Sequence, residues 1–255
     1  MRRIVLFILA LFLIFTNLPV ESAPSIMKKE MQVVSSDGFN ISATLSYPKV
    51  KSIKEFKTVV LLHSLGYNSQ WWEGLPKILL DKGYAVLAID LRGHGNSVYN
   101  SKLTKVSWKS MKNSAYAKYP RDIISVIEAV KDENSKKIFF NNWAIVGADI
   151  GASAGVLASD KLTVKPKTIV MISPVVKTKG LFIPVSMAHL DNVDFLTISG
   201  KEDYSSIEAS EYLHKFAQAE FVEFTSESKT TGMLMLKNAP ETVHLISEWI
   251  AEYLN

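Results

Sequence analysis

Runs of apolar, largely β-branched residues alternate with helical segments from residue 57 to the end of the chain. Residues 58–62 (TVVLL) are continuously apolar, as expected of a strand buried on both faces of a parallel sheet. Residues 119–133 place isoleucine and valine at helical spacing, which predicts an amphipathic helix. Further strands are predicted at residues 84–89, 143–146, 168–172, 195–199 and 221–225, and further helices at 70–82, 151–160, 205–219 and 240–254. This alternation predicts an α/β fold with a doubly wound, mostly parallel sheet and helices on both faces.

A hairpin precedes this alternation. Residues 31–35 and 39–47 flank the turn dipeptide Asp37-Gly38, and the second segment alternates apolar with polar side chains. We therefore expect an antiparallel hairpin at one edge of the sheet. No linker-like stretch rich in proline, glycine or serine follows, so residues 23–255 are predicted to form a single domain.

The first 22 residues have the features of a secretion signal. A basic start, Met1-Arg2-Arg3, precedes an apolar run from Ile4 to Phe15, and small residues follow Pro19. The apolar run is shorter than the roughly 20 residues that a membrane-spanning helix needs. We expect a cleaved signal and an exported chain, periplasmic or extracellular, with an uncleaved N-terminal anchor as the alternative and as the only membrane contact.

Composition excludes several classes of protein. The chain has no cysteine, which excludes a disulfide framework, a thiolate nucleophile and a cysteine-based metal site. Its 29 basic and 25 acidic residues leave a small excess that forms no block, so nucleic-acid binding has no support. No motif predicts a cofactor. Asp149, Glu202 and Asp203 are metal-ligand types, but nothing in their spacing demands a metal, and none is predicted.

Four loops follow predicted strands at the edge where such sheets bind ligands. They are His63-Ser64-Leu65-Gly66, residues 90–97 (DLRGHGNS), Gly147-Ala148-Asp149-Ile150-Gly151, and residues 200–203 (GKED). In this order they resemble the loops of the α/β-hydrolase superfamily, above all its small esterase-like and dienelactone-hydrolase-like members without a large lid. The resemblance covers nearly all of residues 23–255.

The resemblance implies a role for each loop. The first would donate an oxyanion-hole N–H, the third would be the nucleophile elbow, and the fourth would carry the triad acid. Glycines at positions 147 and 151 are required at such an elbow because side chains there would clash. The residues that the resemblance assigns to shaping the oxyanion hole and the site are His63, Ser64, Leu65, Ile150 and His94.

The sequence departs from the family pattern at two of these positions. The elbow carries Asp149 in place of serine, and residues 226–232, where the triad histidine belongs, contain none. Lys229 stands about where that histidine would be, whereas Asp203 matches the acid. One hypothesis is that Asp149 and Asp203 raise each other's pKa and that Lys229 forms an ion pair with both. These three residues are the candidate catalytic positions.

Asp149 also has a catalytic interpretation. Haloalkane dehalogenases and epoxide hydrolases, in the same superfamily, use an elbow aspartate to form an alkyl-ester intermediate, which a histidine-activated water then releases. They tend to carry tryptophan directly after the aspartate, where this chain has Ile150. Without a histidine, turnover should stall after the first step. The sequence thus favours a degenerate hydrolase that binds a small acyl- or ester-like ligand, or a partner, in the old site. The alternative is an active hydrolase of ester, acyl or alkyl substrates that uses Asp149, or else Ser153, as nucleophile.

Ser153 and the five histidines are the further candidates for a nucleophile or a base. Ser153 lies in a second Gly-x-Ser-x-Gly pattern, which begins four residues too late and is better explained by close helix packing. His63 and His94 precede the acid in chain order and are predicted to be structural. Surface or satisfied positions are predicted for the remaining histidines, with His94 and His244 the ones that could be recruited as a base.

Overall fold

An eight-stranded sheet forms the centre of the part of the chain that the computed structural model describes, residues 25–50, 55–134 and 137–254. The predicted secretion signal lies outside these residues. In spatial order the strands are β1 (Ile26–Val34), β2 (Asn40–Pro48), β4 (Ala85–Ile89), β3 (Phe56–Leu62), β5 (Ile138–Ala148), β6 (Thr168–Ile172), β9 (Asp194–Gly200) and β10 (Phe221–Ser226). The β1–β2 and β2–β4 pairs are antiparallel and the others are parallel, which confirms the predicted edge hairpin and mostly parallel sheet.

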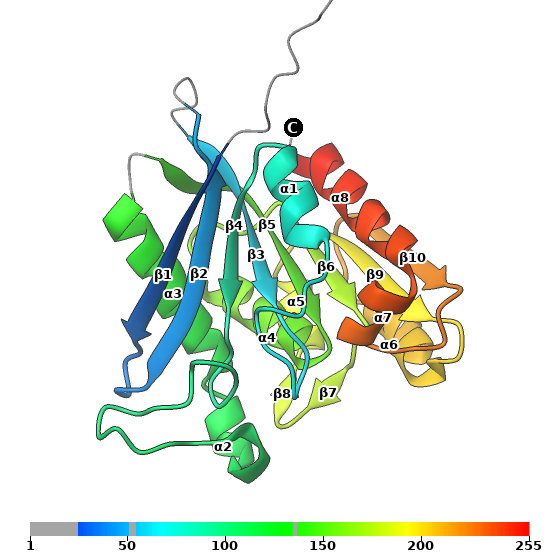
Figure 1. Cartoon of the computed structure of the whole chain (residues 1–255). Helices are drawn as coiled ribbons and strands as arrows, with labels where there is room; N and C mark the ends of the chain where they lie inside the picture. The colour runs from blue at the N-terminus through cyan, green and yellow to red at the C-terminus, as the bar shows by residue number, and fades with distance from the viewer. Residues whose placement is uncertain (1–24, 51–54, 135–136, 255) are drawn as a thin grey trace, which may run out of the picture.

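Helices cover both faces of this sheet (Figure 1). Within β3, Val59 and Leu61 join one apolar cluster, whereas Val60 and Leu62 join the other, because neighbouring side chains of a strand point to opposite faces. On the Val59 side lie α1 (Leu75–Asp81), α7 (Met233–Asn238) and α8 (Pro240–Leu254); on the other lie α3 (Tyr119–Asn134), α4 (Ile150–Lys161), α5 (Pro184–Ala188) and α6 (Tyr204–His214). Short elements complete the fold, namely the 3₁₀ turn η1 (Trp108–Ser110), α2 (Asn113–Tyr116) and the hairpin strands β7 (Lys177–Thr178) and β8 (Leu181–Phe182).

Element boundaries depart from the sequence prediction at the ends of two strands and two helices. Strand β1 begins at Ile26 and not at residue 31, and β5 begins at Ile138 and not at residue 143. The predicted helix 70–82 begins only at Leu75, because Glu73 has a φ of +46° and Gly74 and a proline in the first turn define the start. The predicted helix 205–219 already ends at His214. The short helices α5 and α7 and the β7–β8 hairpin were not predicted. No helix within the described ranges is long and apolar enough to cross a membrane.

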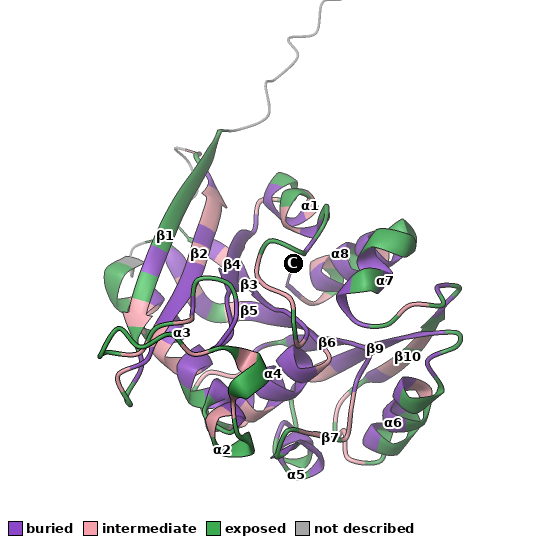
Figure 2. Ribbon diagram, turned by 60° about the horizontal axis from the view of Figure 1, so that its bottom comes forward, coloured by how far each residue is buried: buried purple, intermediate pink, exposed green. Residues whose placement is uncertain are grey.

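The parallel strands all end at one edge of the sheet (Figure 1). The loops that follow β3, β5, β6, β9 and β10 therefore meet there, although they lie far apart in the sequence. The central strands are buried, as the purple centre of Figure 2 shows, while parts of the loops are accessible. The buried strand ends therefore hold the first residues of each loop in place. This edge holds the candidate residues.

Candidate active site

A strained turn at Asp149 joins β5 to α4. Asp149 has a φ of +49° and a ψ of −119°, and its N–H donates to the carbonyl of Ile172 at 2.9 Å. A side chain at position 151 would overlap the carbonyl oxygen of Leu62, and one at position 147 would overlap the backbone of Ala152. Both glycines are thus required for steric reasons, as predicted. The turn lifts Asp149 above the sheet edge in the geometry of a nucleophile elbow.

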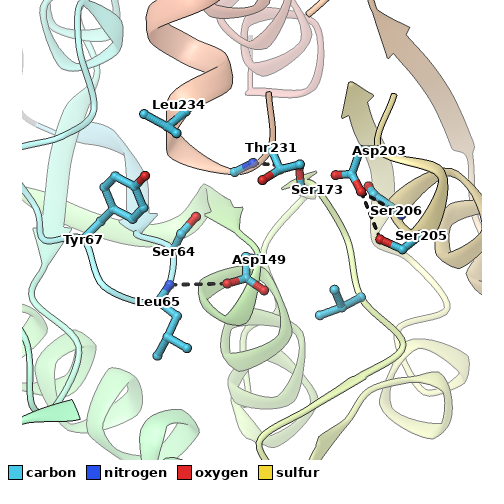
Figure 3. A pocket seen from close by; sticks show the side chains of 12 residues that line it. Ser64, Leu65, Tyr67, Asp149, Ser173, Asp203, Ser205, Ser206, Thr231 and Leu234 are labelled. Atoms are coloured by element: carbon cyan, nitrogen blue, oxygen red, sulfur yellow. Dashed lines mark hydrogen bonds between the residues drawn. The ribbon is translucent and has the colours of Figure 1, made fainter. Parts of the chain in front are cut away.

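Backbone N–H groups face the Asp149 carboxylate. The N–H of Leu65 donates to Oδ2 at 3.4 Å, the bond drawn in Figure 3. Burial raises the pKa of Asp149, and hydrogen bonds from the N–H groups of Ile150 and Leu65 oppose that rise. The charge of Asp203 raises this pKa further, while Lys179 lowers it. The two N–H groups that would bind a substrate oxyanion in a hydrolase thus already have an anionic acceptor from the chain itself.

Asp203 lies on the far side of the same pocket. It is the N-cap of α6, where its Oδ1 accepts from the N–H of Ser206 at 3.2 Å and from the hydroxyl of Ser205 at 3.0 Å. The residue is buried and lines the pocket together with Asp149 (Figure 3). The structure thus brings the predicted elbow and acid positions to one site.

The expected ion pair between Lys229 and the two aspartates is wrong. The Lys229 amine lies 2.6 Å from a carboxylate oxygen of Glu202, and 67% of its side chain is exposed. Among the described residues neither Asp149 nor Asp203 forms an ion pair with it. The reason is the packing of the loop: Ser228 is buried and Gly200 lies against the carbonyls of Ser228 and Thr230, so the side chain between them turns to solvent.

Thr231 and Gly232 border the pocket and belong to the 226–232 loop, in which the triad histidine was expected. The N–H of Gly232 donates to the Ser173 hydroxyl at 2.8 Å, and Ser173 follows β6 with a φ of +49°. Sequence reasoning missed Ser173 and Thr231 as site residues. The signal available for Ser173 was its position directly after a predicted strand. For Thr231 the sequence held no signal, because it does not show how the 226–232 loop turns.

The pocket encloses about 350 Å³. Two carboxylates and several hydroxyls form most of its polar surface, and leucine and valine side chains supply the apolar part. Its lining residues are Ser64, Leu65, Tyr67, Asp149, Ser173, Val175, Asp203, Ser205, Ser206, Thr231, Gly232 and Leu234. None of these described lining residues is histidine, lysine or arginine, so the pocket wall offers no imidazole to accept a proton.

His63 and His94 shape the first loop from beneath the pocket. His63 is fully buried; its Nε2 accepts from the N–H of Leu91 at 2.9 Å, and its Nδ1 lies 2.8 Å from the carbonyl of Ser64. His94 Nε2 accepts from the N–H of Gly66 at 3.0 Å, and its ring stacks on Trp108. Burial lowers the pKa of both imidazoles, which keeps them neutral and able to accept. Their structural role agrees with the prediction.

The other candidate residues lie away from the pocket wall. Ser153 is fully buried inside α4, so a substrate cannot reach its hydroxyl. His189 pairs with Asp160, and His214 pairs with Glu223. His244 lies on the exposed side of α8. None of these histidines lies on the pocket wall, so none of them replaces the missing base.

Strand order, elbow and acid position together define the α/β-hydrolase class. The family profile described as "Serine aminopeptidase, S33" matches residues 54–215, and the chain belongs to this α/β-hydrolase family. No curated protein sequence matches the chain. The aspartate at the elbow is a departure from the serine that gives the family its name.

Solved structures with similar folds include several esterases. An esterase from Pyrococcus furiosus superposes with a TM-score of 0.70 at 15% identity, covering 90% of this chain and 92% of that one. A dienelactone hydrolase from Anabaena variabilis gives 0.65 at 14% identity, with 90% and 99% covered. An esterase from Rhizomucor miehei gives 0.68 at 13% identity, with 91% and 85% covered. At these identities the likeness establishes the fold.

Proposed function

We propose that this protein is an exported, esterase-like α/β-hydrolase that binds a small acyl- or ester-like ligand without turning it over efficiently. The observation that carries the proposal is the Asp149 carboxylate at the elbow, which faces the N–H groups of Leu65 and Ile150. A substrate carbonyl would have to compete with this anion for the same donors. The proposed export rests on the sequence of residues 1–22 alone.

The absence of an imidazole from the described pocket wall supports the same proposal. A serine or water nucleophile needs a general base within hydrogen-bond reach, and the acid then orients that base. Here Asp203 is retained, but the loop in which the resemblance places the imidazole contributes only Thr231 and Gly232 to the pocket wall. Proton transfer from a nucleophile therefore has no route through an imidazole, because the titratable side chains of the described wall are the two carboxylates and the Tyr67 phenol.

Hydrolysis of short p-nitrophenyl esters tests this proposal directly. We expect wild-type protein to release p-nitrophenol no faster than the buffer. The double variant Asp149→Ser, Thr231→His restores a hydroxyl and an imidazole on the pocket wall beside Asp203, and we expect it to gain measurable esterase activity. A matched control is Asp149→Ser, Lys229→His, because Lys229 faces solvent beside Glu202; this variant should stay inactive.

The alternative is an active hydrolase in which Asp149 attacks the substrate. The preserved elbow geometry favours it, since the carboxylate is presented at the pocket as a nucleophile would be. In that case wild-type protein turns over an ester or alkyl halide, and Asp149→Asn abolishes the activity. A covalent adduct on Asp149, detected by mass spectrometry of the intact protein, would distinguish a stalled first step from simple binding. Clear wild-type turnover would overturn the proposed function.

A further inference from the structure

We infer that the Asp149–Asp203 pocket binds its acyl- or ester-like ligand through a protonated primary amine, which the ligand carries beside an apolar body. The inference deepens the proposed function, because it names the chemical class that the same pocket would take. It rests on the charge of the pocket, on one buried hydroxyl without a partner, and on the shape of the remaining wall.

The described pocket wall carries two acidic side chains, Asp149 and Asp203, and no basic one. The charge of Lys179 lowers the pKa of Asp149, but this residue lies on the exposed β7–β8 turn, outside the lining. An anionic ligand would add a third charge of the same sign, whereas an ammonium group would face two carboxylates of opposite sign.

A buried hydroxyl supplies the independent observation. Ser64 is only 4% exposed, and its Oγ has no hydrogen-bond partner. Figure 3 shows this hydroxyl pointing away from the Leu65 backbone into the pocket. A buried polar group without a partner costs free energy, so a ligand that donates to the Ser64 hydroxyl would supply a hydrogen bond that the described residues do not.

An ammonium group matches these acceptors in number and kind. It carries three donors and no acceptor, and the pocket offers carboxylate oxygens and hydroxyl oxygens around it. A metal ion fits less well, because no group of three or more histidine, aspartate or glutamate side chains in the described ranges could hold one. The charge-assisted bonds of an ammonium are stronger than those of a neutral alcohol in the same place.

The rest of the wall accommodates the carbon body of such an amine. Leu65, Val175 and Leu234 line the pocket, and the Tyr67 ring stands on the same side as Leu234 (Figure 3). Tyr67 in turn packs edge-to-face against the half-exposed Trp71, with ring centroids 5.2 Å apart. A volume of about 350 Å³ admits a single-ring amine.

Titration calorimetry with three probes of one shape tests the inference. Benzylamine, benzyl alcohol and benzoate share a ring and differ in the charge of the terminal group. We expect benzylamine at neutral pH to bind about tenfold more tightly than benzyl alcohol, because its bonds to the carboxylates are charge-assisted. Benzoate should show no binding. Equal affinity for the amine and the alcohol, tighter binding of benzoate, or no binding of benzylamine would overturn the inference.

Isosteric variants locate the binding site. Asp203→Asn keeps an N-cap for α6, since asparagine caps as well as aspartate, and it should weaken benzylamine binding about tenfold. Ser64→Ala should weaken it roughly threefold to tenfold through loss of one hydrogen bond. Glu202→Gln is the matched control: it neutralises the adjacent residue, which pairs with Lys229, and should leave the affinity unchanged. Equal losses in Asp203→Asn and Glu202→Gln would contradict the assigned site.

Failure of this inference and failure of the proposed function give different results. Turnover of p-nitrophenyl esters would overturn the proposed function and leave the preference for amine over alcohol measurable. A pocket that binds esters without turnover and does not distinguish the amine from the alcohol would overturn only the inference. Displacement of benzylamine by millimolar Ca²⁺ would also contradict it, since a metal ion would then be the better occupant.

Discussion

Asp149 combines backbone strain with a buried charge at one position. Its φ of +49° is uncommon for a residue other than glycine, and burial raises the pKa of its carboxyl group. Strain of this kind, with buried charge, is a feature of functional sites, where the surrounding structure maintains it against its cost. Gly147 and Gly151 allow the turn, and the N–H groups of Leu65 and Ile150 oppose the rise in pKa.

His63 gives the first prediction at this scale, a dependence of stability on acid pH. Burial, with His94 nearby, lowers the pKa of His63 from 6.5 to about 4. Between these two pKa values the unfolded chain binds a proton at His63 and the folded protein does not. The stability that neutral His63 allows is therefore fully present above pH 6.5 and is lost as the pH falls toward 4. The loss should approach about 3 kcal/mol in the free energy of unfolding.

Urea unfolding from neutral pH to pH 4 measures this effect as a difference between proteins. The variant His63→Gln keeps an acceptor and a donor but cannot titrate, so the stability advantage of wild type over the variant should shrink as the pH falls through that window. A stability advantage of wild type over His63→Gln that is independent of pH would contradict the prediction.

Strands and helices with a strong hydrophobic pattern were predictable from the sequence. Within loops, only the residues next to a strand or helix were predictable. The run TVVLL and the strand at Thr168–Ile172 lie where predicted, because a strand buried on both faces can only be continuously apolar. Asp149 and Asp203 were found because each directly follows a strand or begins a helix. Lys229 was placed wrongly, because the side chain of this loop that reaches the pocket is that of Thr231, two residues further along, and sequence alone does not fix the turn to that precision.

The elbow gives a prediction at the scale of the element. Gly151→Ala would press a Cβ onto the carbonyl of Leu62 in β3, and backbone there cannot move without disturbing the sheet. We expect a loss of roughly 3 kcal/mol or more in the free energy of unfolding. Gly74→Ala at the start of α1 is the matched control, because its Cβ meets nothing within 4 Å and its φ is −76°.

The two glycine variants should therefore differ clearly in the free energy of unfolding measured with denaturant. Gly74→Ala is expected to lie within about 0.5 kcal/mol of wild type. If Gly151→Ala were equally harmless, the close contact between α4 and β3 would not be what holds the elbow in shape. Circular dichroism of both variants would show whether a destabilised Gly151→Ala protein keeps the fold.

At the scale of the whole molecule, the edge hairpin must be held to the helical layer. Arg92, in the loop after β4, is 4% exposed and forms this link. Its Nε donates to Asp122 of α3 at 2.8 Å, and its Nη1 donates to Asp37 in the β1–β2 turn at 2.7 Å. Asp37 also pairs with Lys118, so it keeps a partner if Arg92 is removed, whereas Asp122 is buried. One guanidinium thus joins a sheet edge, a loop and a helix.

Removal of this guanidinium should lower the free energy of unfolding mainly because the Asp122 carboxylate is left buried without a partner of opposite charge. Arg92→Met fills similar space and leaves the Asp122 carboxylate buried and unpaired, so we expect a loss of about 3–5 kcal/mol in urea unfolding. The double variant Arg92→Met, Asp122→Leu removes both charges and should recover much of that loss. Lys77→Met, which breaks the exposed Lys77–Asp81 pair of α1, is the control and should cost at most about 0.5 kcal/mol. A double variant no more stable than Arg92→Met alone would mean that packing around the guanidinium, and not its charge, holds the hairpin to α3.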